Sequence, residues 1–318
     1  MAKTRETWLA AGCLALIPLF GLLAAAARPA PATTGLEARL RAIAAGFGGT
    51  VTLAGADLKT GESFGIDADR PVSTASIIKL PVMVEAFYQM AAGKLQWAQP
   101  LVMQKEDQVP GSGILQSLDP GLHLTLGDAI TLMIVLSDNT AANLVIGQTG
   151  IAPVNARMQQ LGLRHTVLFS LVFHPPAPPQ PDGYKQFGLG ETTAADMVRL
   201  LTLIQEHKIL DPAACDHMLA ILAGQRDNDA FPRYMDRFTS RPSHPEISWA
   251  HKTGALNAVR NDVGIVTTPA GPIVLAGFAQ DSPDRRWTAD NAALLVLGRL
   301  ARAVVAWYLP PAGKIKGQ

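Results

Sequence analysis

Strand-like segments occur near both ends of this 318-residue chain and enclose a long helical middle. Helical apolar spacing covers 36–47 and 289–308, and the region from about 76 to 222 is dominated by helical patterns. We therefore predict a mixed α/β (α+β) fold, in which both chain ends enter one five-stranded antiparallel sheet flanked by terminal helices. The middle then forms an all-helical lobe, with the active site in the cleft between the two. The predicted strands cover 50–56, 62–66, 248–254, 262–267 and 272–280.

The N-terminal segment has the organisation of an export signal. A basic start, Met-Ala-Lys-Thr-Arg, precedes an apolar run over 8–27 that ends in four alanines. The alternative is an uncleaved anchor, because about 20 apolar residues can also span a bilayer. We expect cleavage and a secreted or periplasmic protein that meets a membrane only through this segment.

The predicted organisation follows from that assignment. It comprises a signal over 1–27, a linker over 28–34 and one domain over 35–318. Within the domain we expect a sheet lobe from about 35–72 and 245–318, and a helical lobe from about 73–244.

Composition restricts the partners of the chain. The formal net charge is +1, from 27 basic and 26 acidic residues, so there is no electrostatic footprint for nucleic acid. Cys13 lies in the signal, which leaves Cys215 alone, and we expect it to be a small buried hydrophobe. Because no cluster of His, Cys and Asp has ligand spacing, we predict no metal and no cofactor. A small-molecule substrate and a monomer are expected.

The first of three short motifs is Ser76-Ile77-Ile78-Lys79. At a helix start, positions i and i+3 share a face, so the Lys79 amine can reach the Ser76 hydroxyl. A helix N-terminus also directs free backbone N–H groups, including that of Ser76, at an oxyanion beside the serine. By itself the motif is weak, since a helix start with a surface lysine has the same pattern.

Two further motifs supply the remaining groups of an acyl-transfer site. Ser137-Asp138-Asn139 ends an apolar run, where Ser137 can relay a proton to a leaving nitrogen and Asn139 can hold a substrate amide. Lys252-Thr253-Gly254 lies in a predicted strand, where the lysine and the threonine can hold a carboxylate and the glycine lets a ligand approach. The backbone N–H of Ala255 follows as a second oxyanion donor. We expect the His251 side chain to point to the opposite face from Lys252.

In this order and at these intervals, the three motifs resemble those of class A-like serine β-lactamases and related penicillin-recognising enzymes. The resemblance implies that Ser76 is the acylated nucleophile, Lys79 the proton carrier and Ser137 the proton relay. It also implies that Arg260 helps Lys252 and Thr253 to bind a substrate carboxylate, although a surface salt-bridge arginine on a strand is the alternative. Further matching stretches are 110–115, 132–136, 139–144 and 260–264.

The chain departs from the family in one loop. Efficient members carry a Glu-x-x-Leu-Asn motif after the second motif, and its glutamate positions the hydrolytic water. Here the corresponding residues 164–174 contain no carboxylate. His174 is a candidate substitute base, because its ordinary pKa suits proton transfer, and Glu191 is a second candidate whose more probable role is to close the base of the loop. Because five prolines lie between His174 and Gly190, we predict neither helix nor interior strand there.

Three functions are consistent with these residues. The first is a secreted serine hydrolase that acylates Ser76 with a β-lactam and hydrolyses its amide bond, with slow turnover. The second is a penicillin-recognising D-alanyl peptidase or esterase. The third is a non-hydrolytic module that binds β-lactams or wall peptides.

Overall fold

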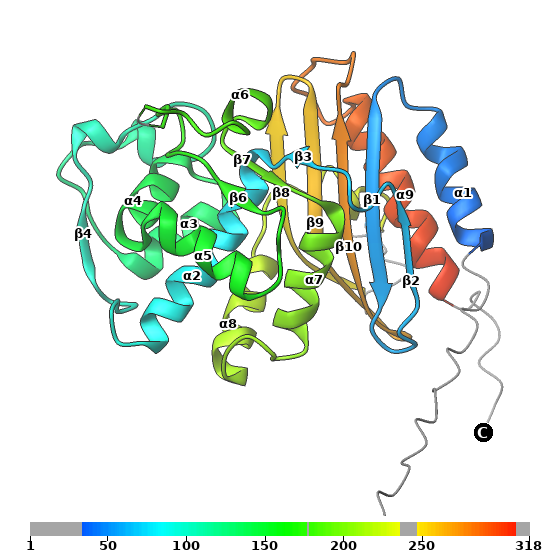
Figure 1. Cartoon of the computed structure of the whole chain (residues 1–318), viewed down its shortest axis with the longest axis horizontal. Coiled ribbons are helices and arrows are strands. Elements are labelled where there is room, and N and C mark those ends of the chain that lie inside the picture. The colour runs from blue at the N-terminus through cyan, green and yellow to red at the C-terminus, as the bar shows by residue number, and fades with distance from the viewer. Residues whose placement is uncertain (1–33, 177, 236–246, 310–318) are drawn as a thin grey trace, which may run out of the picture. The chain divides into compact units, whose positions relative to one another are not determined.

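The computed structural model describes residues 34–309 except for Ala177 and residues 236–246 (Figure 1). The predicted signal and all but the last residue of the predicted linker therefore lie outside the described residues. Thr34, which we assigned to the linker, is instead the first residue of a helix. None of the described helices is long and apolar enough to cross a membrane.

The main sheet has five antiparallel strands in the order β2-β1-β10-β9-β8. Strands from the two ends of the chain meet at the β1–β10 pair, where Thr50 lies opposite Gln280. This arrangement confirms the predicted fold class. The strands are β1 (Thr50–Asp57), β2 (Ser63–Ile66), β8 (Ser248–Leu256), β9 (Val259–Thr268) and β10 (Gly271–Gln280).

Successive side chains of the central strands enter two different cores. Ile273 and Leu275 of β10 pack into a cluster with the helices α1 (Thr34–Ala45) and α9 (Ala292–Tyr308), which cover one face of the sheet (Figure 1). Val274 on the same strand packs into the cluster of the opposite face. This alternation follows from the period of two in a strand, and burial on both faces makes the strands apolar throughout.

The other face carries the helical part of the chain (Figure 1). Its helices are amphipathic or wholly apolar, and their buried sides form one continuous core with the sheet. They are α2 (Lys79–Ala91), α3 (Leu126–Val135), α4 (Asn139–Thr149), α5 (Ile151–Gln160), α7 (Ala194–Gln205) and α8 (Pro212–Ala223).

Short elements connect these layers. A three-stranded sheet has the order β3-β7-β6, and β4 pairs with β5. The strands are β3 (Val72–Ser73), β4 (Pro100–Val102), β5 (His123–Thr125), β6 (Val167–Leu168) and β7 (Gly190–Thr192), and 3₁₀ turns cover Ala75–Ile78, Lys105–Asp107, Leu115–Ser117 and Phe231–Tyr234.

Our prediction of no helix between His174 and Gly190 was wrong. The one-turn helix α6 (Tyr184–Phe187) lies there. All five prolines precede it in the chain, so its four residues keep their N–H donors, and Gly188, at φ 67°, ends the turn. Gly190 itself begins β7.

Candidate active site

Ser76 lies in the 3₁₀ turn Ala75–Ile78, and α2 begins directly after it at Lys79. Residues i and i+3 eclipse one another in a 3₁₀ turn, so the turn brings Ser76 and Lys79 to one side, as the motif spacing predicts. Ala75 has φ 45°, in the left-handed region that residues with a Cβ seldom adopt. Strained backbone of this kind persists only where its surroundings fix it.

Two amide side chains from the sheet fix the chain just before Ser76. Asn261 Nδ2 on β9 donates to the carbonyl oxygens of Ser73 and Thr74, at 3.0 and 3.1 Å. Gln280 on β10 donates to Asn261 Oδ1 at 2.9 Å and holds that carboxamide in place. The serine turn is therefore anchored to the sheet. The sequence analysis assigned no role to Asn261 or Gln280, because their partners are backbone atoms more than 180 residues away.

The third motif lies beside the same turn. A Cβ on Gly254 would lie 2.9 Å from Thr74 O and 3.2 Å from Ile77 N, so β8 can pass this close only with a glycine there. Because β8 is an edge strand, alternate N–H groups along it have no strand to pair with. The contact thus brings the edge of β8, with Ala255 next in sequence, to the turn that carries Ser76.

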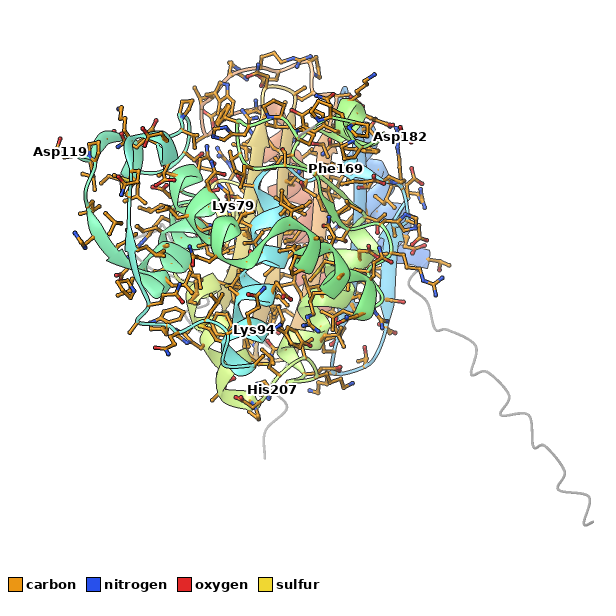
Figure 2. The ribbon with its side chains drawn as sticks, turned by 60° about the vertical axis from the view of Figure 1, so that its left-hand side comes forward. Lys79, Lys94, Asp119, Phe169, Asp182 and His207 are labelled. Atoms are coloured by element: carbon orange, nitrogen blue, oxygen red, sulfur yellow. The ribbon has the colours of Figure 1, made fainter. Side chains whose placement is uncertain are left out.

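Lys79 is fully buried and bonded to the second motif. Its Nζ lies 2.7 Å from Ser137 O, 2.7 Å from Asn139 Oδ1 and 3.4 Å from Ser137 Oγ. The sequence analysis placed this amine within reach of the Ser76 hydroxyl, and among the described residues its hydrogen bonds go to Ser137 and Asn139. Figure 2 shows Lys79 in the interior of the fold, whereas Lys94 lies beyond the far end of α2.

Ser137 is the meeting point of two lysines. Lys252 Nζ donates to Ser137 Oγ at 2.9 Å and to Thr253 O at 2.7 Å. Ser137 itself has φ 55°, a left-handed conformation at the junction of α3 and α4. One hydroxyl therefore links the lysines of the first and third motifs.

Burial and proximity change the proton affinity of both lysines. The pKa of Lys79 is well below its usual value, because the amine is desolvated and lies near the Lys252 ammonium, while the Asp138 carboxylate opposes the shift. Burial also lowers the pKa of Lys252, to about 7, against the opposing charges of Asp227 and Asp262. Both shifts make the uncharged amine easier to reach than it is for a lysine in water.

The Asp138 side chain organises the turn around this pair. Its Oδ2 accepts from the N–H groups of Ile114 and Leu115, at 2.7 and 2.9 Å, and its Oδ1 caps α4 through Ala141 N at 2.9 Å. Asn139 Nδ2 donates to Pro110 O at 2.9 Å. These bonds tie the stretch 110–115 to the second motif and fix the Asn139 carboxamide between Lys79 and Pro110.

Thr253 and Arg260 lie on adjacent strands, and both are largely buried. Arg260 donates to the carbonyls of Leu256 and Val259 and, at 2.9 Å, to Arg286 O. Its guanidinium also lies 4.4 Å from the centre of the Trp287 ring. Three of its five N–H groups are therefore used to hold backbone, a structural role that the carboxylate-binding interpretation did not foresee.

The loop over 164–174 is attached to α4 by one side chain. Asn143 accepts from Val172 N at 2.8 Å and donates to Val172 O at 3.1 Å. Because Asn143 follows Asn139 by four positions, both occupy the same side of α4. This clamp therefore fixes Val172 on the helix side that meets Lys79. The sequence analysis assigned Asn143 no role.

Within the described residues, neither candidate base is hydrogen-bonded to the three motifs through its side chain. His174 is exposed on the turn after the Val172 clamp, and its backbone N–H donates to Leu171 O. Glu191 lies on β7, paired with Ser73 and Val167, and burial raises its pKa. The base of the loop is also joined by Thr166 to Asp196, at 2.9 Å. Figure 2 places Asp182, the other carboxylate of this region, at the exposed outer edge.

A loop after α8 completes the side of the site near Lys252. Arg226 N donates to Val135 O, two residues before Ser137, and Asn228 Oδ1 lies 3.3 Å from His251 Nε2. Asp227 sits between these anchors and is exposed. Its carboxylate raises the pKa of Lys252. The loop beside Lys252 therefore carries an acidic group, Asp227, which the sequence analysis did not identify.

His251 lies on the other face of β8 from Lys252, as predicted. Its Nδ1 is 2.9 Å from Asp262 Oδ1, and both side chains are fully buried. Asp262 Oδ2 accepts from Phe231 N at 3.0 Å. Burial raises the pKa of Asp262, against the neighbouring His251. The pair joins β8, β9 and the Phe231 turn behind the site.

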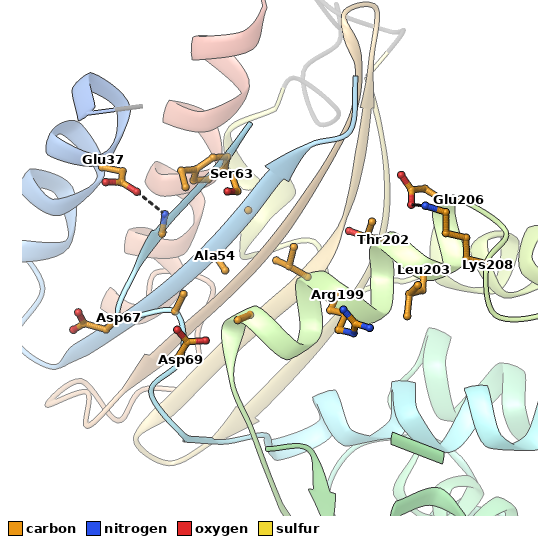
Figure 3. A pocket seen from close by; sticks show the side chains of 16 residues that line it. Glu37, Ala54, Ser63, Asp67, Asp69, Arg199, Thr202, Leu203, Glu206 and Lys208 are labelled. Atoms are coloured by element: carbon orange, nitrogen blue, oxygen red, sulfur yellow. Dashed lines mark hydrogen bonds and ion pairs between the residues drawn. The ribbon is translucent and has the colours of Figure 1, made fainter. Parts of the chain in front are cut away.

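A cavity of about 740 Å³ lies elsewhere, between β1, β2 and α7 (Figure 3). None of the motif residues lines it. Two of its carboxylates are already engaged, Glu37 with Gly65 N and Glu206 with Lys208. The three motifs therefore meet away from this cavity, around Ser137 and the turn that carries Ser76. In the described part of the chain, no group of three or more His, Cys, Asp or Glu residues could hold a metal.

Solved structures share this fold. The β-lactamase of Sphaerobacter thermophilus DSM 20745 is 33% identical, with a TM-score of 0.76 over 88% of this chain and 100% of that chain. PBP-A is 26% identical, with a TM-score of 0.73 over 86% and 96%. An ancestral class A β-lactamase, at 23% identity and a TM-score of 0.73 over 86% and 100%, is similar in fold.

Sequence comparison agrees with the structural likeness. One curated protein, the β-lactamase regulatory protein BlaB of Streptomyces cacaoi, is 30% identical over 109 residues, which are 34% of this chain. The chain matches only 35% of the length of that protein. The family model described as "Beta-lactamase enzyme family" matches residues 35–308. The chain therefore belongs to this family, whose fold and motifs are those of serine β-lactamase-like hydrolases.

Proposed function

We propose that this protein is a serine hydrolase of the β-lactamase type that acylates Ser76 with β-lactams and releases the product slowly. The observation that carries the proposal is the convergence of two buried lysines on Ser137 Oγ, beside the turn that holds Ser76. Such a chain of groups can move a proton from an attacking hydroxyl to a leaving nitrogen. By the family resemblance, the ligand is a small amide that carries a carboxylate.

The contacts of Lys79 favour a role as the base in acylation. Its lowered pKa makes the neutral amine accessible, and a neutral amine has two N–H donors and one lone pair. The two short bonds, to Ser137 O and Asn139 Oδ1, use both donors. The lone pair is then available to take the proton of the Ser76 hydroxyl as its oxygen attacks the lactam carbonyl.

The remaining groups would stabilise the oxyanion, transfer the proton and bind the ligand carboxylate. The N–H groups of Ser76 and Ala255 would stabilise the oxyanion of the tetrahedral intermediate. Ser137 would pass the proton to the lactam nitrogen when the C–N bond breaks. Lys252 and Thr253 would hold the ligand carboxylate, with Arg260 contributing through its remaining N–H groups.

Release of the acyl group is expected to be slow. Residues 164–174 contain no carboxylate to orient water, and a missing general base costs about 10²–10⁴-fold in rate. The same feature favours a second candidate, a penicillin-recognising D-alanyl peptidase or esterase that β-lactams inhibit. A variant of PBP-A, 25% identical to this chain, is described as an acyl-enzyme complex with penicillin G.

A chromogenic cephalosporin tests these functions. Continuous turnover supports the β-lactamase, whereas a burst equal to the enzyme concentration supports the second candidate or a non-hydrolytic binding module. Turnover of a D-alanyl peptide or an ester then separates the last two. Ser76→Ala is the control and should show no covalent adduct by intact-protein mass spectrometry. Absence of both turnover and an adduct on the parent protein would refute all three functions.

Localisation is part of the proposal. The basic start and apolar run of residues 1–27 support export, with an uncleaved anchor as the alternative. Fractionation of cells that express the full chain, with N-terminal sequencing of the product, decides between them. A full-length product in the cytosolic fraction would contradict both.

A further inference from the structure

Phe173 has two unusual properties. Its side chain is 64% exposed, the second-highest value among the exposed large hydrophobic residues of the described chain. Its φ is 59°, in the left-handed region where a bulky residue is an outlier. The backbone on both sides is fixed, since Asn143 clamps Val172 and His174 N donates to Leu171 O. The surroundings therefore hold the aromatic ring outside the core, and strained backbone of this kind clusters at functional sites.

The ring lies next to the Asn139 carboxamide. A Cβ on Gly111 would be 3.4 Å from Phe173 Cε2 and 2.8 Å from Asn139 Nδ2. Two atoms at those distances from one point are separated by no more than their sum, 6.2 Å. Asn139 Oδ1 is in turn 2.7 Å from Lys79 Nζ. Because Gly111 has no side chain, the space between the ring and the carboxamide stays open.

We propose that Phe173 is a specificity-determining residue, whose ring forms the apolar wall against which the acyl substituent of a bound amide lies. The inference rests on the proposed function, in which Asn139 contacts the substrate amide. A substituent on the amide carbonyl extends a few ångströms from that contact. The ring lies within the same range, because its Cε2 is no more than 6.2 Å from Asn139 Nδ2. The site then favours ligands with an aromatic or apolar acyl group next to the amide, because ring–ring contact adds to burial.

The test compares two penicillins that share one bicyclic nucleus. Benzylpenicillin carries a phenylacetyl group on the amide nitrogen, and 6-aminopenicillanic acid carries no acyl group. Acylation efficiency at Ser76 is measured by time-resolved mass spectrometry. Phe173→Ala should lower the efficiency for benzylpenicillin about three- to tenfold, and should change that for 6-aminopenicillanic acid less than twofold.

Further variants separate the ring from the backbone. Phe173→Asn should give the same loss, because asparagine tolerates the left-handed conformation and keeps the turn. Phe173→Tyr should retain the parent preference. Val102→Ala, a truncation of another exposed hydrophobic residue on β4, is the matched control and should change neither efficiency.

The outcomes are distinct. The role of Phe173 is overturned if both penicillins lose acylation efficiency equally. It is also overturned if neither penicillin loses efficiency in Phe173→Ala and Phe173→Asn. A parent protein that neither penicillin acylates refutes the proposed function itself. If Phe173→Ala does not fold, as judged by its thermal transition, Phe173→Asn decides the question.

Discussion

The two sides of the proposed active site differ in what they offer a ligand. On the sheet side and at the starts of α2 and α4, Lys79, Ser137 and Lys252 form a closed set of short hydrogen bonds. On the other side, the loop over 164–174 is fixed to α4 through the backbone of Val172 and carries no acidic side chain. The first side can form an ester, whereas the second lacks the group that would orient water to break it.

In the proposed function, the two half-reactions therefore depend on different parts of the fold. Formation of the ester depends on residues that are anchored to the sheet by Asn261 and Gln280. Its hydrolysis would depend on the loop over 164–174, which the Val172 clamp fixes in place but which has no carboxylate. The following experiments change one side at a time.

Lys79→Ala should have the largest effect. Removal of the proposed base and of its bonds to Ser137 and Asn139 should lower the acylation rate by about 10²–10⁴-fold. The rate is followed as an adduct by mass spectrometry. Lys94→Ala, a change at an exposed lysine beyond the far end of α2, should acylate at the parent rate (Figure 2). Parent-like acylation of Lys79→Ala would show that another group takes the proton.

Val172→Glu should supply the carboxylate that the loop over 164–174 lacks. It places a carboxylate at the residue that Asn143 clamps, and we expect deacylation to rise by about 10–100-fold, part of the usual contribution of a general base. The measurement is single-turnover decay of the acyl-enzyme. Val172→Gln has the same shape without the charge and should decay at the parent rate. Equal decay of both variants would place the water elsewhere.

Asn143→Ala tests whether the clamp matters to function as well as to stability. The variant leaves the buried Val172 N–H and C=O without these partners, at a cost of about 1–3 kcal/mol in the free energy of unfolding. Asn155 makes the same two-bond clamp on Leu168, which gives a matched control. We expect both alanine variants to unfold at lower urea concentrations, and only Asn143→Ala to alter the acyl-enzyme lifetime. Identical lifetimes would make Asn143 purely structural.

Asp227→Asn should have the smallest effect, and it depends on pH. The Lys252 cation is present below its folded-state pKa of about 7 and is lost as pH rises through that value. The groups that act on it are Lys79, Asp262 and Asp227, and loss of the last lowers the pKa further. Above pH 7, acylation by a carboxylate-bearing ligand should therefore fall by about two- to tenfold. At pH 6 the change should be smaller.

Asp229→Asn is the control for this change. It removes another carboxylate of the same loop, one that does not act on Lys252. Its pH profile should match that of the parent. A profile of Asp227→Asn that superimposes on the parent profile would show that the Asp227 charge does not act on ligand binding.

The sheet and the chemistry-bearing motifs could be predicted from the sequence because both are local patterns. Alternation along 50–56 follows from which face of a strand is buried, and the spacing of Ser76 and Lys79 follows from helical geometry. The polar residues that secure the site could not be found this way. Asn261 reaches carbonyls 187 and 188 positions away, and no local pattern marks an amide with such partners.

The pKa shifts of the two lysines could not be predicted from composition either. A lysine in a motif has its ordinary pKa until the fold removes water and places a second ammonium beside it, as it does for Lys79. The sequence places Lys79 within reach of Ser76, but it did not indicate that the left-handed turn at Ser137 brings a carbonyl to the same amine. Arg260 was assigned to a ligand carboxylate or to a surface salt bridge, because backbone carbonyls that accept from it leave no pattern in the sequence.

The pairing of Thr50 with Gln280 has a consequence for how the chain is made. A ribosome adds residues in order, so the β1–β2 hairpin is complete at Ile66, 214 residues before the end of β10, the strand that covers its open edge. Topologies with such distant pairing fold slowly. Nascent chains arrested anywhere before residue 280 should accordingly remain sensitive to protease, however complete the helices already synthesised.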